Sequence, residues 1–104
     1  MAEELTSQEF SEYIKAPVAF IDFFAEWCMP CMMMSPIIED LSEEFEGKVK
    51  IGKVNIDDYH DLAEKYNISS IPSFIIFKEG KPVKQLVGSM TQEELSDAIS
   101  KFID

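Results

Sequence analysis

Segments with the apolar spacing of a strand alternate along the chain with segments that have the apolar spacing of a helix. From residue 18 to residue 24 both alternating sets of positions are apolar, and Asp22 interrupts the run. Such a run is typical of a strand that is buried on both faces. Three further segments are predicted to be strands, at residues 49–56, 74–77 and 83–87.

Helical spacing of apolar residues occupies the segments around these strands. It predicts helices that start near Thr6, at the cysteine pair, between the second and third strands, and near Thr91. Thr6 and Thr91 are each followed three positions later by glutamate, which is a capping box. Pro17, Gly47 and Asn67 are placed to end helices.

The resulting order is αβαβαββα, which predicts a protein of the α/β class. Strands that alternate with helices imply a parallel core, and a closing hairpin around residues 79–82 adds an antiparallel edge. We expect one domain over residues 1–104, with a central mixed sheet of about four strands flanked by about four helices.

The charge of the chain excludes several classes of partner. Its 20 acidic and 9 basic residues give a formal net charge of -11, and every basic residue is lysine. This charge opposes binding to a polyanion, and arginine is the usual residue for phosphate and base contacts. We therefore expect no nucleic acid and no anionic membrane as a partner.

The N-terminal segment and the longest apolar run bear on localisation. Residues 1–10 are acidic and have neither the basic start nor the apolar core of a secretory signal. The apolar run at residues 17–24 is too short to cross a bilayer. We expect a cytoplasmic protein that is a monomer.

The two cysteines carry the strongest indication of chemistry. Cys28 and Cys31 enclose Met29 and Pro30, at the point where a predicted strand gives way to a predicted helix. A disulfide between them would close too short a loop to constrain the unfolded chain, so stability is a poor reason for the pair. Two thiols at this spacing can close and reopen a disulfide, and an exposed pair of this kind is a redox site.

The position of each cysteine predicts its role. Cys28 lies at the start of the helix, where unpaired N–H groups and the helix dipole favour a thiolate and lower its pKa toward neutrality. Cys28 then attacks a substrate disulfide, and Cys31, one helical turn further on, resolves the mixed disulfide. No lysine occurs between Lys15 and Lys48, so the thiolate depends on the helix and on hydrogen bonds.

The chain resembles the thioredoxin family over about residues 10–102. The matching parts are residues 21–31 with Trp27 before the first cysteine, Pro36 later in the same helix, Ile71-Pro72 before an apolar strand, and the hairpin residues 78–80 and 87–88. Met29, Met32 and Phe24 depart from the commonest pattern of the family, and the first two bear on the redox potential.

The resemblance implies a thioredoxin fold and a dithiol–disulfide oxidoreductase that reduces protein disulfides. It also implies that Asp22, a carboxyl in a buried strand, lies behind Cys31 and moves its proton, and that Lys53 pairs with Asp22. Ile71-Pro72 would be cis, and the backbone of Ile71 would pair with the substrate. The residues implied to form the substrate-binding surface are Trp27, Met29, Pro30, Ile71, Pro72, Gly88 and Met90.

The implied partners are protein substrates that contain a disulfide and a separate thioredoxin reductase. No dissociable cofactor is expected, because the cysteine pair itself carries the electrons.

Two other functions remain as alternatives. Met29, Met32, Met33 and Met34 offer soft sulfur ligands for Cu(I), but helical spacing would scatter them around the helix. A binding protein without redox activity could use the same scaffold, although it would not need both cysteines. No structural metal site is expected, because zinc takes four ligands and His60 is the single histidine.

Overall fold

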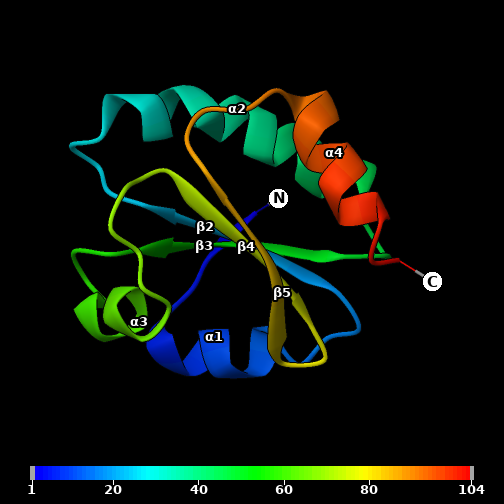
Figure 1. The fold of residues 1–104 in the computed structure, drawn as a ribbon, viewed down its shortest axis with the longest axis horizontal. Coiled ribbons are helices and arrows are strands. Elements are labelled where there is room, and N and C mark those ends of the chain that lie inside the picture. Colours follow the sequence, from blue (N-terminus) through cyan, green and yellow to red (C-terminus); the bar gives the residue numbers. More distant parts are fainter. Residues whose placement is uncertain (1, 104) are drawn as a thin grey trace.

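The chain folds around a five-stranded sheet, and the computed structural model describes residues 2–103. The spatial order of the strands is β1-β3-β2-β4-β5. The strands are β1 (Glu3–Glu4), β2 (Ala19–Phe24), β3 (Lys50–Asn55), β4 (Ser73–Lys78) and β5 (Lys81–Val87). The helices are α1 (Ser7–Tyr13), α2 (Met29–Glu44), α3 (His60–Lys65) and α4 (Gln92–Ser100). Helices α2 and α4 cover one face of the sheet, and α1 and α3 cover the other (Figure 1).

The sheet is mixed, as the sequence predicts. β1, β3 and β2 run parallel, whereas β4 is antiparallel to both β2 and β5. β2 lies in the middle, and all of its residues are buried. Asp22 on β2 is in register with Lys53 of β3 and with Phe74 of β4. The central position of β2 explains why both of its faces are apolar.

The first strand, β1, was not predicted. It consists of two exposed glutamates, so it carries no apolar pattern. Glu3 and Glu4 become a strand by pairing in parallel with Gly52 and Lys53 of β3. A side chain on Gly52 would collide with the side chain of Leu5, which follows β1. The close packing of Leu5 against β3 therefore depends on glycine at position 52.

The closing hairpin is tighter than predicted. The expected turn at residues 79–82 is reduced to Glu79 and Gly80, whose φ angles are 50° and 87°. Lys81 and Pro82 belong to β5, which is an edge strand. An edge strand accepts proline because one side of its backbone has no partner strand.

The predicted helix starts are confirmed. Thr6 and Thr91 each accept a hydrogen bond from the backbone N–H three residues further on, and both capping boxes are complete. Asn67 follows α3 in the left-handed region with φ of 55°. Helix α1 ends at Tyr13, before Pro17.

Two apolar cores lie on the two faces of the sheet. Phe20 of β2 packs into the core beneath α2 and α4, whereas Ile21 and Phe23 pack into the core above α1 and α3. Asp22 therefore follows Phe20 toward the α2 face, where it reaches the start of that helix. Within residues 2–103, no helix is long and apolar enough to span a membrane.

Candidate redox site

Cys28 and Cys31 form a disulfide at the start of α2. Cys28 is the N-cap of the helix, and its Sγ accepts a hydrogen bond of 3.2 Å from the backbone N–H of Cys31. Pro30 lies in the first turn, where its missing N–H would have no partner within the helix. The pair follows the carboxyl end of β2, so the central strand fixes its position (Figure 1).

The disulfide is less exposed than predicted. Cys28 is 4% exposed and Cys31 is 2% exposed, and Ile71 packs against the small cluster that they form. The exposed groups are the neighbours of Cys28, since Trp27 is 70% and Met29 69% exposed. The surface beside the buried sulfurs is therefore apolar.

Asp22 carries a buried carboxyl group. The residue is 2% exposed, and its Oδ1 has no hydrogen-bond partner among residues 2–103. Burial raises the pKa of the carboxyl to about 7, and the positive charge of Lys53 offsets part of that rise. The carboxyl therefore exchanges its proton close to neutral pH.

A hollow of about 390 Å³ joins Asp22 to the inner side of the disulfide. Cys31, Ser35 and Lys53 also line this inner hollow. The described residues include no direct ion pair between Lys53 and Asp22, and the lysine Nζ lies 5.5 Å from the centre of the Phe24 ring. Lys53 acts on the carboxyl through its charge rather than through contact.

The loop before β4 lies on the outer side of the disulfide. The Ile71–Pro72 peptide bond is cis, as the resemblance implies. The N–H of Gly88 donates a hydrogen bond of 2.9 Å to the carbonyl oxygen of Pro72, which ties the loop to the end of β5. Ile71 also packs on the cysteine cluster, so the loop that carries the cis bond lies beside the disulfide.

Methionines line a groove of about 540 Å³ on the α4 side of the disulfide. Met29, Met33 and Ile37 of α2 lie along it with Pro30, and Met90 lines it from the loop before α4. Met33 is 71% exposed. Met33 and Ile37 were not predicted to be site residues, although Met29, Met33 and Ile37 follow one another at intervals of four and so share one helix face. We refer to this site as the methionine groove.

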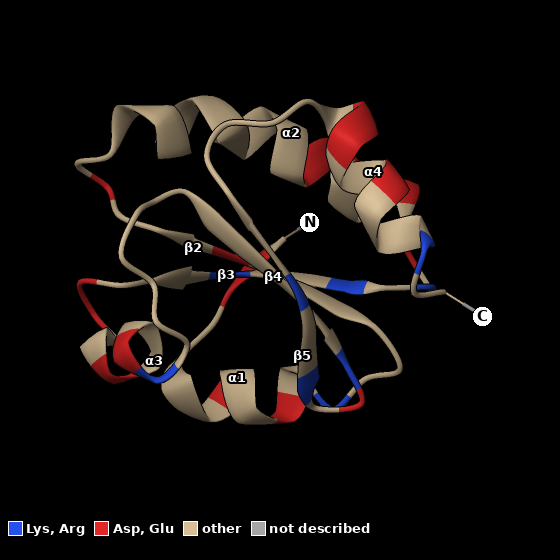
Figure 2. Cartoon of the chain, in the orientation of Figure 1, with Lys and Arg blue, Asp and Glu red and all other residues tan. Residues whose placement is uncertain are grey.

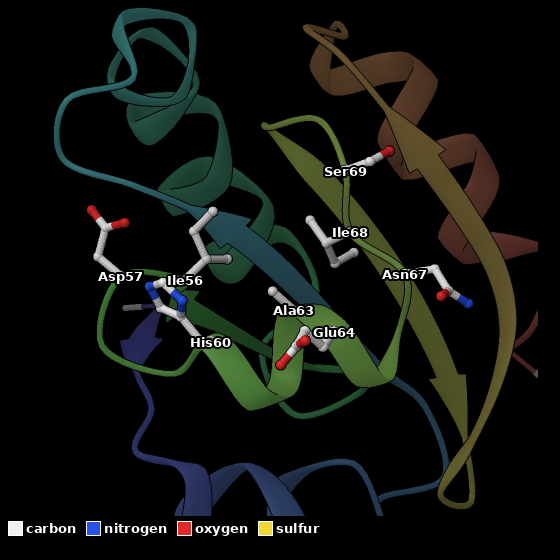
Figure 3. A pocket seen from close by; sticks show the side chains of 8 residues that line it. All are labelled: Ile56, Asp57, His60, Ala63, Glu64, Asn67, Ile68 and Ser69. Carbon is white, nitrogen blue, oxygen red and sulfur yellow. The ribbon is translucent and has the colours of Figure 1, made fainter.

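A second groove, of about 590 Å³, lies beside α3, and we refer to it as the α3 groove (Figure 3). The residues that line it are Ile56, Asp57, His60, Ala63, Glu64, Asn67, Ile68 and Ser69. The indole Nε1 of Trp27 donates a hydrogen bond of 2.9 Å to Oδ2 of Asp57, at one end of this groove. The sequence alone does not indicate this α3 groove, because its residues form no motif.

The four methionines near the pair do not share one site. Met29, Met33 and Met34 line the methionine groove, and Met34 is also buried in the core beneath α2. Met32 instead lines the inner hollow. Within residues 2–103, no group of three or more His, Cys, Asp or Glu side chains could hold a metal ion. This arrangement gives no support to a Cu(I) centre built from all four methionines.

Negative charge prevails near the disulfide. Figure 2 shows no lysine along the start of α2 or along the segment that joins it to β2. Glu26 lies in that segment, and Asp57 holds Trp27. Stabilisation of a Cys28 thiolate therefore falls to the helix N-terminus and to the N–H of Cys31.

A cysteine pair that closes at a helix N-terminus, on an α/β sheet, defines the class of dithiol–disulfide oxidoreductases. The family model for thioredoxin matches residues 1–101. A thioredoxin of Staphylococcus aureus is 37% identical over 100 residues, which are 96% of each chain. The oxidised thioredoxin of Plasmodium falciparum is 32% identical, with a TM-score of 0.88 over the whole of both chains. A thioredoxin of Malassezia sympodialis is 30% identical, with a TM-score of 0.89 over 98% of this chain and 90% of that one.

The chain belongs to the thioredoxin family. It is a thioredoxin-type dithiol–disulfide oxidoreductase with a Cys28–Cys31 pair. Membership of the family implies substrates that contain a disulfide, and a reductase as a partner.

Proposed function

We propose that the chain reduces disulfides of other proteins in two exchange steps. The Cys28 thiolate attacks one sulfur of the substrate disulfide, forms a mixed disulfide and expels the other sulfur as a thiolate. Cys31 then loses its proton and attacks Sγ of Cys28, which closes the Cys28–Cys31 disulfide and releases the second substrate thiolate. Two electrons pass from the cysteine pair to the substrate.

The observation that carries this proposal is the position of Cys28 at the N-cap of α2. The N–H of Cys31 points at its Sγ from 3.2 Å, and a thiolate accepts this bond more strongly than a thiol does. The exposed side chains of Trp27 and Met29 flank Cys28, whereas Cys31 lines the inner hollow. This placement supports Cys28 as the nucleophile and Cys31 as the resolving cysteine.

Asp22 is proposed to take the proton of Cys31 in the second step. Both residues line the inner hollow, which has room for a water molecule between them. A carboxyl with a pKa of about 7 can accept and return a proton near neutral pH. Lys53 favours the ionised carboxylate, so its role is to tune Asp22.

The outer side of the disulfide is proposed to bind the substrate chain. The backbone of Ile71, beside the cis Pro72, would pair with the substrate as an added strand. Apolar contacts would come from the remaining predicted residues, which are Trp27, Met29, Pro30, Gly88 and Met90.

A separate reductase would return the electrons to the cysteine pair. The scheme needs no dissociable cofactor on this chain, because the pair itself carries both electrons. The thioredoxin family model extends over residues 1–101, which supports a single domain, and we infer that this domain acts as a monomer. We infer a cytoplasmic location, because that compartment keeps protein thiols reduced.

Trapping of the mixed disulfide tests this scheme. A Cys31→Ser variant keeps the nucleophile and lacks the resolving thiol, so it is expected to accumulate a covalent complex with a disulfide-bonded protein. Mass spectrometry would detect the complex, and excess dithiothreitol should release it. The Cys28→Ser variant is the matched control and should form far less complex. Absence of a complex with Cys31→Ser, or equal amounts with both variants, would contradict the assigned roles.

A further inference from the structure

The α3 groove combines an apolar floor with a polar rim (Figure 3). Ile56, Ala63 and Ile68 are half-buried and form the floor. The carboxylates of Asp57 and Glu64 stand on the exposed rim, with the imidazole of His60 between them in the view of Figure 3. Such a combination suits a ligand that is apolar along its length and charged at its tip.

The groove is continuous with the redox site. Ile56 lines the groove and also packs against the cluster that contains Cys28. Asp57 lines the groove and accepts the hydrogen bond from Trp27, the residue before Cys28. A substrate chain that places its disulfide over Cys28 therefore has neighbouring residues within reach of the groove.

The charge on the rim is not neutralised by the chain itself. Among residues 2–103, neither Asp57 nor Glu64 forms an ion pair. The nearest lysine in sequence, Lys65, has its Nζ 5.5 Å from the centre of the Tyr66 ring. The whole chain has a net charge of -11, which adds to the local attraction for a cation.

We propose that the α3 groove binds the side chain of a lysine or arginine that lies near the disulfide of a protein substrate. This inference rests on the proposed function and names the class of substrate that the same site favours. The methylene groups of the side chain cover the floor made by Ile56, Ala63 and Ile68. The cationic tip reaches the rim near the carboxylates of Asp57 and Glu64, where it gains charge complementarity and remains hydrated.

Reduction of synthetic peptides tests this proposal. Each peptide is closed by one disulfide and carries lysine, norleucine or glutamate at one position, scanned over the few residues on either side of a cysteine. Norleucine keeps the apolar chain of lysine and lacks the charge. The second-order rate constant for reduction by the reduced protein is measured from the peptide thiols formed, at about 20 mM and about 300 mM salt.

The lysine peptide should react about fivefold faster than the norleucine peptide at low salt, at one or more positions, and the glutamate peptide more slowly. The ratio of lysine to norleucine should approach one at high salt because the ions screen the rim. Glu64→Gln should lower this ratio about twofold, and Asp57→Asn should lower it as well while keeping an acceptor for Trp27. Glu46→Gln removes the same charge from an exposed residue beyond the other end of α2, and it should leave the ratio unchanged.

Three results would overturn the proposal. A ratio of one at every position would show that the groove does not bind the side chain. Equal ratios for Glu64→Gln and Glu46→Gln would show that net charge, and not the groove, is responsible. Failure to reduce any of the peptides or a folded disulfide protein would instead reject the reductase function itself, and the role of the groove with it.

Discussion

The two sides of the Cys28–Cys31 disulfide differ in their surroundings. On the outer side, Cys28 follows the exposed Trp27 and precedes the exposed Met29, and grooves extend in both directions. On the inner side, Cys31 faces a hollow that contains the carboxyl of Asp22 and the ammonium of Lys53. In the proposed function, the outer side contacts another chain and the inner side handles a proton.

This difference shows how two cysteines within one helix turn can have different roles, which in the proposed function are attack by Cys28 and resolution by Cys31. Cys28 is the N-cap, with extended backbone angles, and precedes the exposed Met29, whereas Cys31 lies within the first turn and lines the inner hollow. The first cysteine receives the help of the helix dipole, and the second receives a titratable neighbour. Changes on the inner side should therefore alter stability and pH dependence, whereas changes on the outer side should alter partner affinity.

The largest expected effect is that of Asp22→Asn on the free energy of unfolding. Folding raises the pKa of this carboxyl from 3.8 to about 7, so the folded chain keeps a proton that the unfolded chain releases between these values. Stability is therefore lost as the pH rises through that window, by up to about 4 kcal/mol, and the loss is complete above it. Asp22→Asn removes this penalty, so it should stabilise the oxidised protein at about pH 8 and much less at about pH 4.

Denaturant unfolding of the oxidised protein at both pH values measures this effect. Asp97→Asn, which removes an exposed carboxylate from α4, is the matched control and should change little at either pH. The same Asp22→Asn variant should resolve mixed disulfides more slowly. A loss of stability at about pH 8 would show that Asp22 is a paired structural group.

Met33→Gln should show whether the outer side, and not the inner side, determines the affinity for a protein substrate. It places an amide in the methionine groove, so kcat/KM for a protein disulfide should fall about threefold to tenfold relative to that for a small disulfide. Met32→Gln is the control, because Met32 lines the inner hollow instead. Equal losses for the two variants would argue against a docking role for the groove.

Met32→Lys should give the smallest effect. A cation at the rim of the inner hollow stabilises nearby thiolate, and this favours the reduced state and raises the reduction potential by about 10 mV. Direct redox equilibration of the variant with the unchanged protein detects such a difference. Met32→Gln again serves as the control, since it adds polarity without charge. A lowered potential would show that a cation at position 32 does not stabilise the thiolate.

Apolar spacing predicted the strands and helices whose position depends on burial. Residues 18–24 were recognisable because the middle strand is buried on both faces, and the capping boxes marked two helix starts. Strand β1 escaped prediction because Glu3 and Glu4 are ordered by their pairing with β3 and not by their own pattern. The extent of β5 was also missed, because an edge strand tolerates Lys81 and Pro82.

The site was predictable to the extent that it is local in sequence. Cys28, Cys31 and their position at a helix start could be read directly, and Asp22 stood out as a carboxyl in an apolar strand. The cis state of Ile71-Pro72 came from family resemblance alone, and it is confirmed. The α3 groove could not be predicted from the sequence, because Ile56, Glu64 and Ser69 come together only in the folded chain.

The reduction potential of the Cys28–Cys31 pair tests the central claim most directly. It is measured at neutral pH by equilibration with a glutathione or dithiothreitol buffer, with the dithiol and disulfide forms separated after acid quenching. A reductant of protein disulfides should have a potential of about -270 mV, the value typical of thioredoxin, or somewhat lower. A potential of about -120 to -180 mV, typical of proteins that form or rearrange disulfides, would contradict the account.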